Sequence, residues 1–122
     1  MAISRDTARK TLGAIRIGYG AAGLVAPELL LHGLGVATTT SQPATYPFRM
    51  FGIRTVLIGA DLWLLRGPEL RRATRTAVLI HACDTLSAAV TTIRGDLPRK
   101  QGIVATAISA GNTVLALTAA RA

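Results

Sequence analysis

The chain has few acidic residues, few aromatic residues and a single cysteine among its 122 residues. One cysteine, Cys83, excludes an intramolecular disulfide, and the sequence has no CxxC motif or Cys/His cluster that could hold a structural metal. Only six Asp and Glu oppose 14 Lys and Arg, which gives a formal net charge of +8. Because the sequence has no recognisable nucleic-acid motif and only 4% aromatic residues, we expect no nucleic-acid partner in spite of this charge.

Charged residues of either sign are also scarce, and apolar residues take their place. Charged residues make up 16% of the chain, against about 25% in an ordinary soluble domain. Hydrophobic residues make up 50% of it, and the mean hydropathy is +0.42. A soluble domain of this size has little interior in which to bury so much apolar surface. The composition therefore favours an integral membrane protein whose apolar side chains face lipid.

Four apolar stretches approach the length that crosses a bilayer. They lie at about residues 10–26, 48–65, 74–93 and 102–119. The sequence thus predicts one all-α domain over residues 1–122, a four-helix transmembrane bundle with short loops. The basic start of the chain is similar to a signal peptide. Because Arg16 interrupts its apolar part and no clean cleavage site follows, we expect an uncleaved first span.

The segments between the spans carry the signals of turns and loops. Pro27 should end the first span, and the PELLLHGLG sequence that it opens predicts a short interfacial helix. Residues 36–47 are polar and contain two prolines, which predicts a loop. RGPELRRATR predicts a tight basic connection in which Gly67 and Pro68 break the helix, and RGDLPRK predicts a second turn.

Lys and Arg are distributed unevenly between the two ends of the predicted bundle. Eight lie at the end that holds both termini and the connection between spans two and three, whereas three lie at the other end, or four with Arg49. Positively charged short loops stay in the cytoplasm. The sequence therefore predicts a multi-pass protein of the cell membrane with both termini cytoplasmic. The eight residues are Arg5, Arg9, Lys10, Arg66, Arg71, Arg72, Arg75 and Arg121.

Several polar side chains fall inside or at the edge of the predicted spans. Charge within a lipid-spanning helix is costly, so these groups should face other helices and find partners there. Asn112 in the fourth span is expected to hydrogen-bond between helices. The candidate ligand-binding or structural groups of this polar core are Arg16, Arg49, Arg54, Asp61, His81, Asp84 and Asn112.

Antiparallel spans with a rise of about 1.5 Å per residue place Arg54 at the depth of Asp84, and Asp61 at the depth of His81 and Arg16. We therefore predict an ion pair between Arg54 and Asp84. It is either purely structural or part of an anion-binding or proton-relay site. His81 is either a neutral core histidine bonded to Asp61 or a hydroxyl, or a titrating ligand.

Signals of catalysis are missing from the sequence. No nucleophile elbow, HExxH, P-loop or GxGxxG motif occurs, although Ser, His and Asp are all present. Nothing near Cys83 would activate its thiolate, so we expect it to pack as a small apolar residue. We expect no enzyme, no catalytic residue, no cofactor and no metal.

Short motifs of the chain resemble those of an uncharacterised family of small actinobacterial four-span membrane proteins. The sequence RIGYGAAGLVAPELL is similar to a glycine-rich first span that closes on a proline. Asp84 matches the end of the family's D-x-x-D motif in the third span. The residues that match its R-x-x-G-x-R-D-x-x-x-G motif are Arg49, Gly52, Arg54 and Gly59.

Two positions depart from these family motifs. Thr55 stands where the second motif has Asp, and His81 stands where the third motif often has its first Asp. Asp61 could supply, from a different position, a carboxylate that these motifs have and the chain lacks. The resemblance implies the four-span fold and transfers no activity.

The predicted function is that of a small binding or accessory module in the membrane. Small residues on the spans favour helix association, so we expect a homo-oligomer or a subunit of a larger membrane complex surrounded by membrane lipid. A lipid or quinone-like molecule between the helices is the expected ligand class, with its head near Arg54 or His81. The alternative is a small transporter or proton-coupled carrier that uses the same Arg, Asp and His side chains as a pathway.

Overall fold

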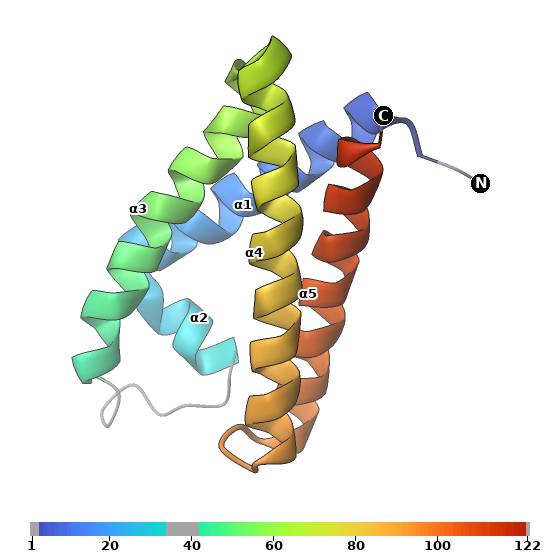
Figure 1. The fold of residues 1–122 in the computed structure, drawn as a ribbon. Coiled ribbons are helices and arrows are strands. Elements are labelled where there is room, and N and C mark those ends of the chain that lie inside the picture. The colour runs from blue at the N-terminus through green and yellow to red at the C-terminus, as the bar shows by residue number, and fades with distance from the viewer. Residues whose placement is uncertain (1–2, 34–41, 122) are drawn as a thin grey trace.

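The described part of the chain is helical throughout, apart from short connections. The computed structural model describes residues 3–33 and 42–121, and these form five helices and no strand. Figure 1 shows two helical pairs, α1 with α3 and α4 with α5, which meet at one end and diverge toward the other. The helices are α1 (Arg5–Val25), α2 (Pro27–Gly33), α3 (Gln42–Leu64), α4 (Gly67–Ile93) and α5 (Arg99–Ala120).

Local sequence signals account for most helix ends. The Ser4 hydroxyl accepts a hydrogen bond from the Thr7 backbone amide and so caps α1. Pro27 follows the end of α1 and is the first residue of α2, and the chain bends by 109° between the two helices. The prediction of a short helix after the first span is therefore confirmed. The turn between α4 and α5 contains Gly95 with φ +79°, a backbone conformation that glycine adopts without steric strain.

Two predicted connections are shorter than expected. Residues 42–47 belong to α3 instead of the predicted polar loop, and residues 67–73 form the first turns of α4 instead of a basic connection. The predicted break between helices is present, since α3 ends at Leu64 and α4 begins at Gly67. Pro68 lies in the first turn of α4, where the amide groups have no intrahelical partner. Polar and basic residues therefore extend these helices beyond their apolar parts. Residues 36–41 of the predicted loop lie outside the described residues.

Glycines let α1 and α3 pack backbone against backbone. A Cβ atom added to Gly20 would lie 2.6 Å from the Val56 amide nitrogen, and one added to Gly59 would lie 2.7 Å from the Gly13 carbonyl oxygen. A Cβ atom on Gly52 would collide with the backbone at Leu24. No side chain larger than hydrogen fits at these positions without separating the helices.

The four long helices meet in a small apolar core near one end. Each contributes one buried residue: Leu12 from α1, Leu62 from α3, Ala77 from α4 and Ala116 from α5. At the same end, the Arg121 guanidinium donates a hydrogen bond of 3.2 Å to the Ile3 carbonyl oxygen. Both ends of the described chain therefore lie at the closed end of the bundle (Figure 1).

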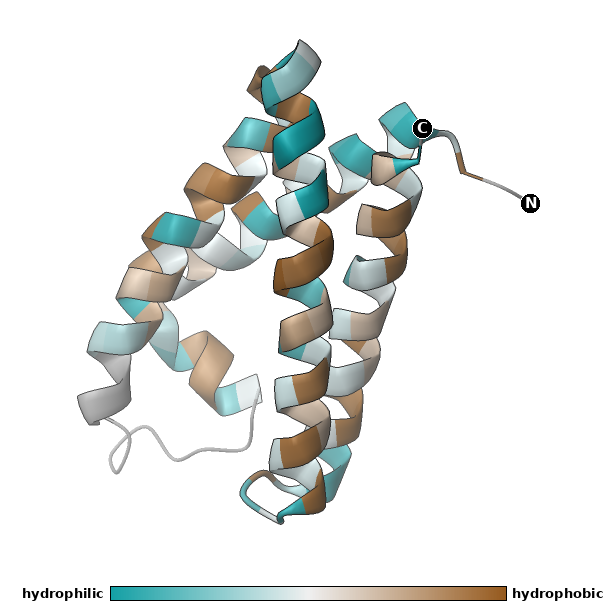
Figure 2. Cartoon of the chain, viewed as in Figure 1, coloured by the Kyte–Doolittle hydropathy of each residue, from teal (hydrophilic) through white to brown (hydrophobic). Residues whose placement is uncertain are grey.

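Two helices, α4 and α5, are long and apolar enough to span a membrane. The bent α1–α2 pair would be a third candidate span if its two helices are counted as one. Figure 2 shows apolar residues along most of both helices and hydrophilic residues at their ends. Many of these apolar side chains are exposed, including Leu79, Leu86 and Ile93 on α4. The fold is thus all-α with apolar, lipid-compatible helices. The helix α3 carries Arg49, Arg54 and Asp61 and is not among the candidate spans.

The glycine contact between α1 and α3 predicts different outcomes for two neighbouring substitutions. Gly20→Ala forces the α1 and α3 backbones apart, and we expect a loss of about 1–3 kcal/mol of stability. A Cβ atom at Gly18 meets nothing within 4 Å, so Gly18→Ala should stabilise by up to about 1 kcal/mol through helix propensity. Thermal unfolding of both variants in detergent checks this. Equal melting temperatures for the two would contradict the described packing.

Candidate functional site

A layer of polar side chains lies directly below the apolar core. Arg16 follows Leu12 by four residues on α1, and His81 follows Ala77 by four residues on α4. On α5, which runs in the opposite direction to α4, Asn112 precedes Ala116 by four residues. Residues four apart lie on one helix face, so each step leads from the core toward the diverging end of the bundle. All three polar residues are buried.

Asp84 joins this layer through an ion pair with Arg16 and a contact with the His81 imidazole. Its Oδ2 atom lies 3.8 Å from Arg16 Nη1 and 3.9 Å from His81 Nδ1. The Arg16 side chain is only 8% exposed and that of His81 only 1%, whereas the Asp84 side chain is 47% exposed. The layer thus contains a buried cation, a buried imidazole and a carboxylate that reaches the surface of the protein.

Some hydrogen-bonding atoms of this layer have no partner. Within the described residues, Arg16 Nε and both ring nitrogens of His81 are buried without a hydrogen bond. The distances to Asp84 Oδ2 also exceed those of hydrogen bonds. Most buried polar groups in proteins are hydrogen-bonded, so these atoms mark a place where a further polar group would be stabilised.

A cleft of about 540 Å³ opens between the diverging helices, with Arg16 and Asp84 in its wall. This volume falls in the range of about 300–1,000 Å³ that small-molecule sites have. The cleft walls are largely apolar, and the uncharged polar groups come mainly from α5. Besides Arg16 and Asp84, the cleft is lined by Tyr19, Leu29, Leu30, Gly33, Phe48, Phe51, Gln101, Val104, Ala105, Ile108, Ser109 and Asn112.

A second groove lies between α3 and the start of α4 and has a volume of about 450 Å³. Asp61, Glu69 and Arg72 are its charged residues, and apolar side chains such as Ile58 and Ile80 form the rest. Asp61 therefore belongs to a different site from Asp84. Within the described residues, no group of three or more His, Cys, Asp or Glu is arranged to hold a metal ion.

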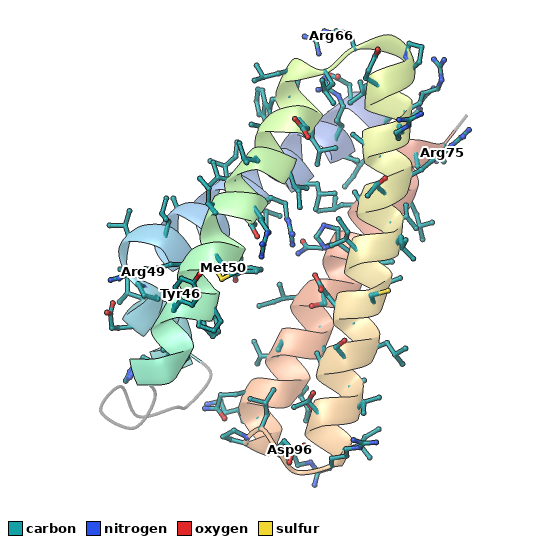
Figure 3. The ribbon with its side chains drawn as sticks, turned by 60° about the vertical axis from the view of Figure 1, so that its left-hand side comes forward. Tyr46, Arg49, Met50, Arg66, Arg75 and Asp96 are labelled. Atoms are coloured by element: carbon teal, nitrogen blue, oxygen red, sulfur yellow. The ribbon has the colours of Figure 1, made fainter. Side chains whose placement is uncertain are left out.

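The structure brings four of the predicted residues together and leaves three apart. Asn112 lines the cleft beside Asp84 and Arg16, with His81 behind them. Arg49, Arg54 and Asp61 are exposed on α3, and Figure 3 shows Arg49 near the beginning of this helix, away from the core. Whether any of these seven residues binds a ligand stays a prediction.

The predicted Arg54–Asp84 ion pair is wrong, because Asp84 pairs with Arg16. The depth of a residue along an antiparallel helix does not determine which helices are neighbours. In the structure, α3 packs mainly against α1 and touches α4 only slightly, whereas α1 also packs against α5. α1 makes even less contact with α4, but it packs against α5, the neighbour of α4, and its long Arg16 side chain reaches Asp84 from there. For the same reason, Asp61 lies in the groove between α3 and α4 and not in the layer of His81 and Arg16.

Two buried residues of this region were missed by sequence reasoning. Thr55 is 1% exposed on α3, and Arg9 is 7% exposed on α1, where it hydrogen-bonds to the Leu62 carbonyl and to Asp6. The hydrogen bond from Arg9, together with a weaker contribution from Lys10, lowers the pKa of Asp6 below its usual value. The spacing of Arg9 and Arg16, two helical turns, was the available signal, since it places both on the buried face of α1.

Comparison of the chain with protein-family models, with curated proteins and with solved structures finds no match. The resemblance to small four-span membrane proteins therefore stays a prediction. The candidate site rests on the geometry of the cleft alone.

A double-mutant cycle distinguishes the observed ion pair from the predicted one. Arg16→Gln and Asp84→Asn each leave the other charge without its partner, so we expect them to couple by roughly 0.5–3 kcal/mol in stability. Arg54→Gln combined with Asp84→Asn should be additive within about 0.5 kcal/mol. Thermal or denaturant unfolding of the five variants in detergent gives both values. Stronger coupling of Asp84 to Arg54 than to Arg16 would contradict the site described.

Proposed function

We propose that the chain is a small membrane binding module that holds an amphipathic, lipid-like or quinone-like molecule in the cleft between its two helical pairs. The observation that carries this proposal is the buried Arg16 side chain, with its unpartnered Nε atom, in the wall of a largely apolar cleft. An apolar body would lie against side chains such as Leu30, Phe48 and Ile108, and a polar head would reach Arg16 and Asp84.

Hydroxyl groups on α4 and α5 support a membrane environment. The Thr85, Thr92 and Thr113 hydroxyls each donate to the backbone carbonyl four residues earlier. In this arrangement a polar side chain on an apolar helix is satisfied within its own helix and needs no water. The Thr85 and Thr113 hydroxyls also lie 3.2 Å apart and connect the two helices.

The distribution of charge supports a four-span topology with cytoplasmic termini. Arg66 and Arg75 lie at the closed end of the bundle, and Asp96 lies at the opposite turn (Figure 3). Ile3 and Arg121, at the two ends of the described chain, also lie at the closed end, together with most of the basic residues. A membrane protein retains its basic end in the cytoplasm. In this topology α1 and α3 also cross the membrane.

The exposed face of α3 supports an accessory role in an assembly. Arg54 and Asp61 are two turns apart and exposed on a helix that, in this topology, lies in the membrane. Such charges are stable in lipid only when protein covers them. A second copy of the chain or a larger membrane complex would supply this cover.

The apolar core favours this function over a proton-coupled carrier. A carrier needs a polar path from its charged layer to each side of the membrane. Here Leu12, Leu62, Ala77 and Ala116 close the bundle between the polar layer and the basic end. Among the described residues, the charged layer is open to the outside of the molecule at the cleft.

Filling the cleft should remove the bound molecule. Ala105 lines the cleft, whereas Ala107 on the same helix is exposed and does not line it. We expect native mass spectrometry of gently extracted protein to find a small apolar molecule on the wild type and on Ala107→Trp, but not on Ala105→Trp. Both variants should have the melting temperature of the ligand-free protein or above. Wild-type protein without any retained molecule, or equal retention by Ala105→Trp, would refute the proposed function.

Cysteine labelling tests the topology. In a Cys83→Ala background, Tyr46→Cys and Asp96→Cys should react with a membrane-impermeant maleimide in intact spheroplasts, because both positions lie at the end opposite Arg66. Arg66→Cys should react only after the membrane is permeabilised. Labelling of Tyr46→Cys and Arg66→Cys from the same side would show that α3 does not cross the membrane.

A further inference from the structure

The charge balance of the cleft carries information about the head of the molecule that it binds. Arg16 and Asp84 are the only charged residues among those that line the cleft in the described chain. They have opposite charge, and His81 does not line the cleft. The net charge at the polar end of the cleft is therefore zero, although the two charged groups lie 3.8 Å apart.

A charged head would upset this balance in a site of low dielectric constant. An anion that approached Arg16 would displace or repel the Asp84 carboxylate, and a cation that approached Asp84 would be repelled by Arg16. A cation would thus take the partner of the buried Arg16 charge, and an anion would leave the half-exposed Asp84 carboxylate unpaired in a largely apolar cleft. An uncharged head leaves the ion pair intact and adds hydrogen bonds to it.

The hydrogen-bond donors of Arg16 and the acceptors of Asp84 determine which groups such a head needs. Arg16 is a donor only, and its Nε atom has no partner within the described residues. The Asp84 carboxylate is an acceptor only. A hydroxyl oxygen can accept from Arg16 while its proton is donated to Asp84. The uncharged Gln101, Ser109 and Asn112 side chains lie in the same cleft and extend this capacity.

The depth of the site also favours an uncharged head. Asp84 precedes the end of α4 at Ile93 by nine residues, which corresponds to about 14 Å of helix. In the proposed topology a phospholipid would have to draw its charged head that far from the membrane surface, which is costly. Moving an uncharged head with one or two hydroxyls to this depth costs much less free energy of dehydration.

We propose that the cleft selects amphipathic molecules with an uncharged, hydroxyl-bearing head, which accepts from Arg16 and donates to Asp84. This inference rests on the proposed function and names the ligand class of the same site. Two sources have this chemistry, an acylglycerol and a reduced quinone. The observations fit both sources, and the experiment below separates them.

Competition between probes with matched tails tests the selection. Purified full-length protein in detergent is incubated with equimolar 1-oleoylglycerol and 1-oleoyl-lysophosphatidylglycerol, which differ in the charge of the head, and bound molecules are counted by native mass spectrometry. We expect the neutral probe to be retained at least about tenfold more, since the anion would bring a second negative charge beside Asp84 in a largely apolar cleft. A parallel arm replaces 1-oleoylglycerol by decylhydroquinone kept reduced. Stronger retention in one arm identifies the source.

A charge-changing variant provides the sharper test. Asp84→Asn leaves Arg16 uncompensated, so the cleft should now retain lysophosphatidylglycerol in preference to 1-oleoylglycerol. The control is Asp61→Asn, which removes the same charge from the other groove and should keep the wild-type preference.

The outcomes separate this inference from the proposed function. Wild-type preference for the anionic probe, or an unchanged preference in folded Asp84→Asn, would overturn the neutral-head inference and leave the proposed function standing. Retention of neither neutral probe nor lysophosphatidylglycerol by the wild type would refute both. If Asp84→Asn does not fold, the wild-type competition still decides the inference.

Discussion

The contact between the backbones of α1 and α3 fixes the position of Arg16, and the site depends on it. Glycines at the crossing let the two helices approach more closely than any side chain would allow. Arg16 lies on the same face of α1 as these glycines, three residues after Gly13 and four before Gly20. Because α1 also packs against α5, the neighbour of α4, the long Arg16 side chain reaches Asp84 on α4. A buried arginine is stable there because a carboxylate lies within reach.

The same contact explains why the bundle holds both a core and a cleft. The four long helices converge on Leu12, Leu62, Ala77 and Ala116, which are small or slender enough for close packing. Beyond this point the two pairs separate, and α2 turns back along the open side after the bend at Pro27. The polar layer lies at the boundary between the two regions. It is buried from the core side and accessible from the cleft side.

The sequence predicted the helices well and their neighbours poorly. Apolar runs and turn residues such as Pro27 and Gly95 act locally, so the helical segments were found with errors mainly at polar ends, as at residues 67–73. The polar residues within the apolar stretches were also recognised from their positions in the sequence. The partner of Asp84 was not, because depth along antiparallel helices favours Arg54, and the packing of α1 that brings Arg16 to Asp84 cannot be read from the sequence. The glycine positions were visible in the sequence, but which helix they would face was not.

The hydrogen bond between Arg121 and Ile3 restricts the number of times that the chain can cross a membrane. Two chain ends that touch must lie on the same side of a bilayer, and this holds only for an even number of crossings. If α4 and α5 account for two, then α1 and α3 either both cross or both remain on one side. A three-span arrangement, with the bent α1–α2 pair as the third span, would separate the ends by the thickness of the membrane. The behaviour of α3 is therefore tied to that of α1, although α3 carries more charge within its apolar part.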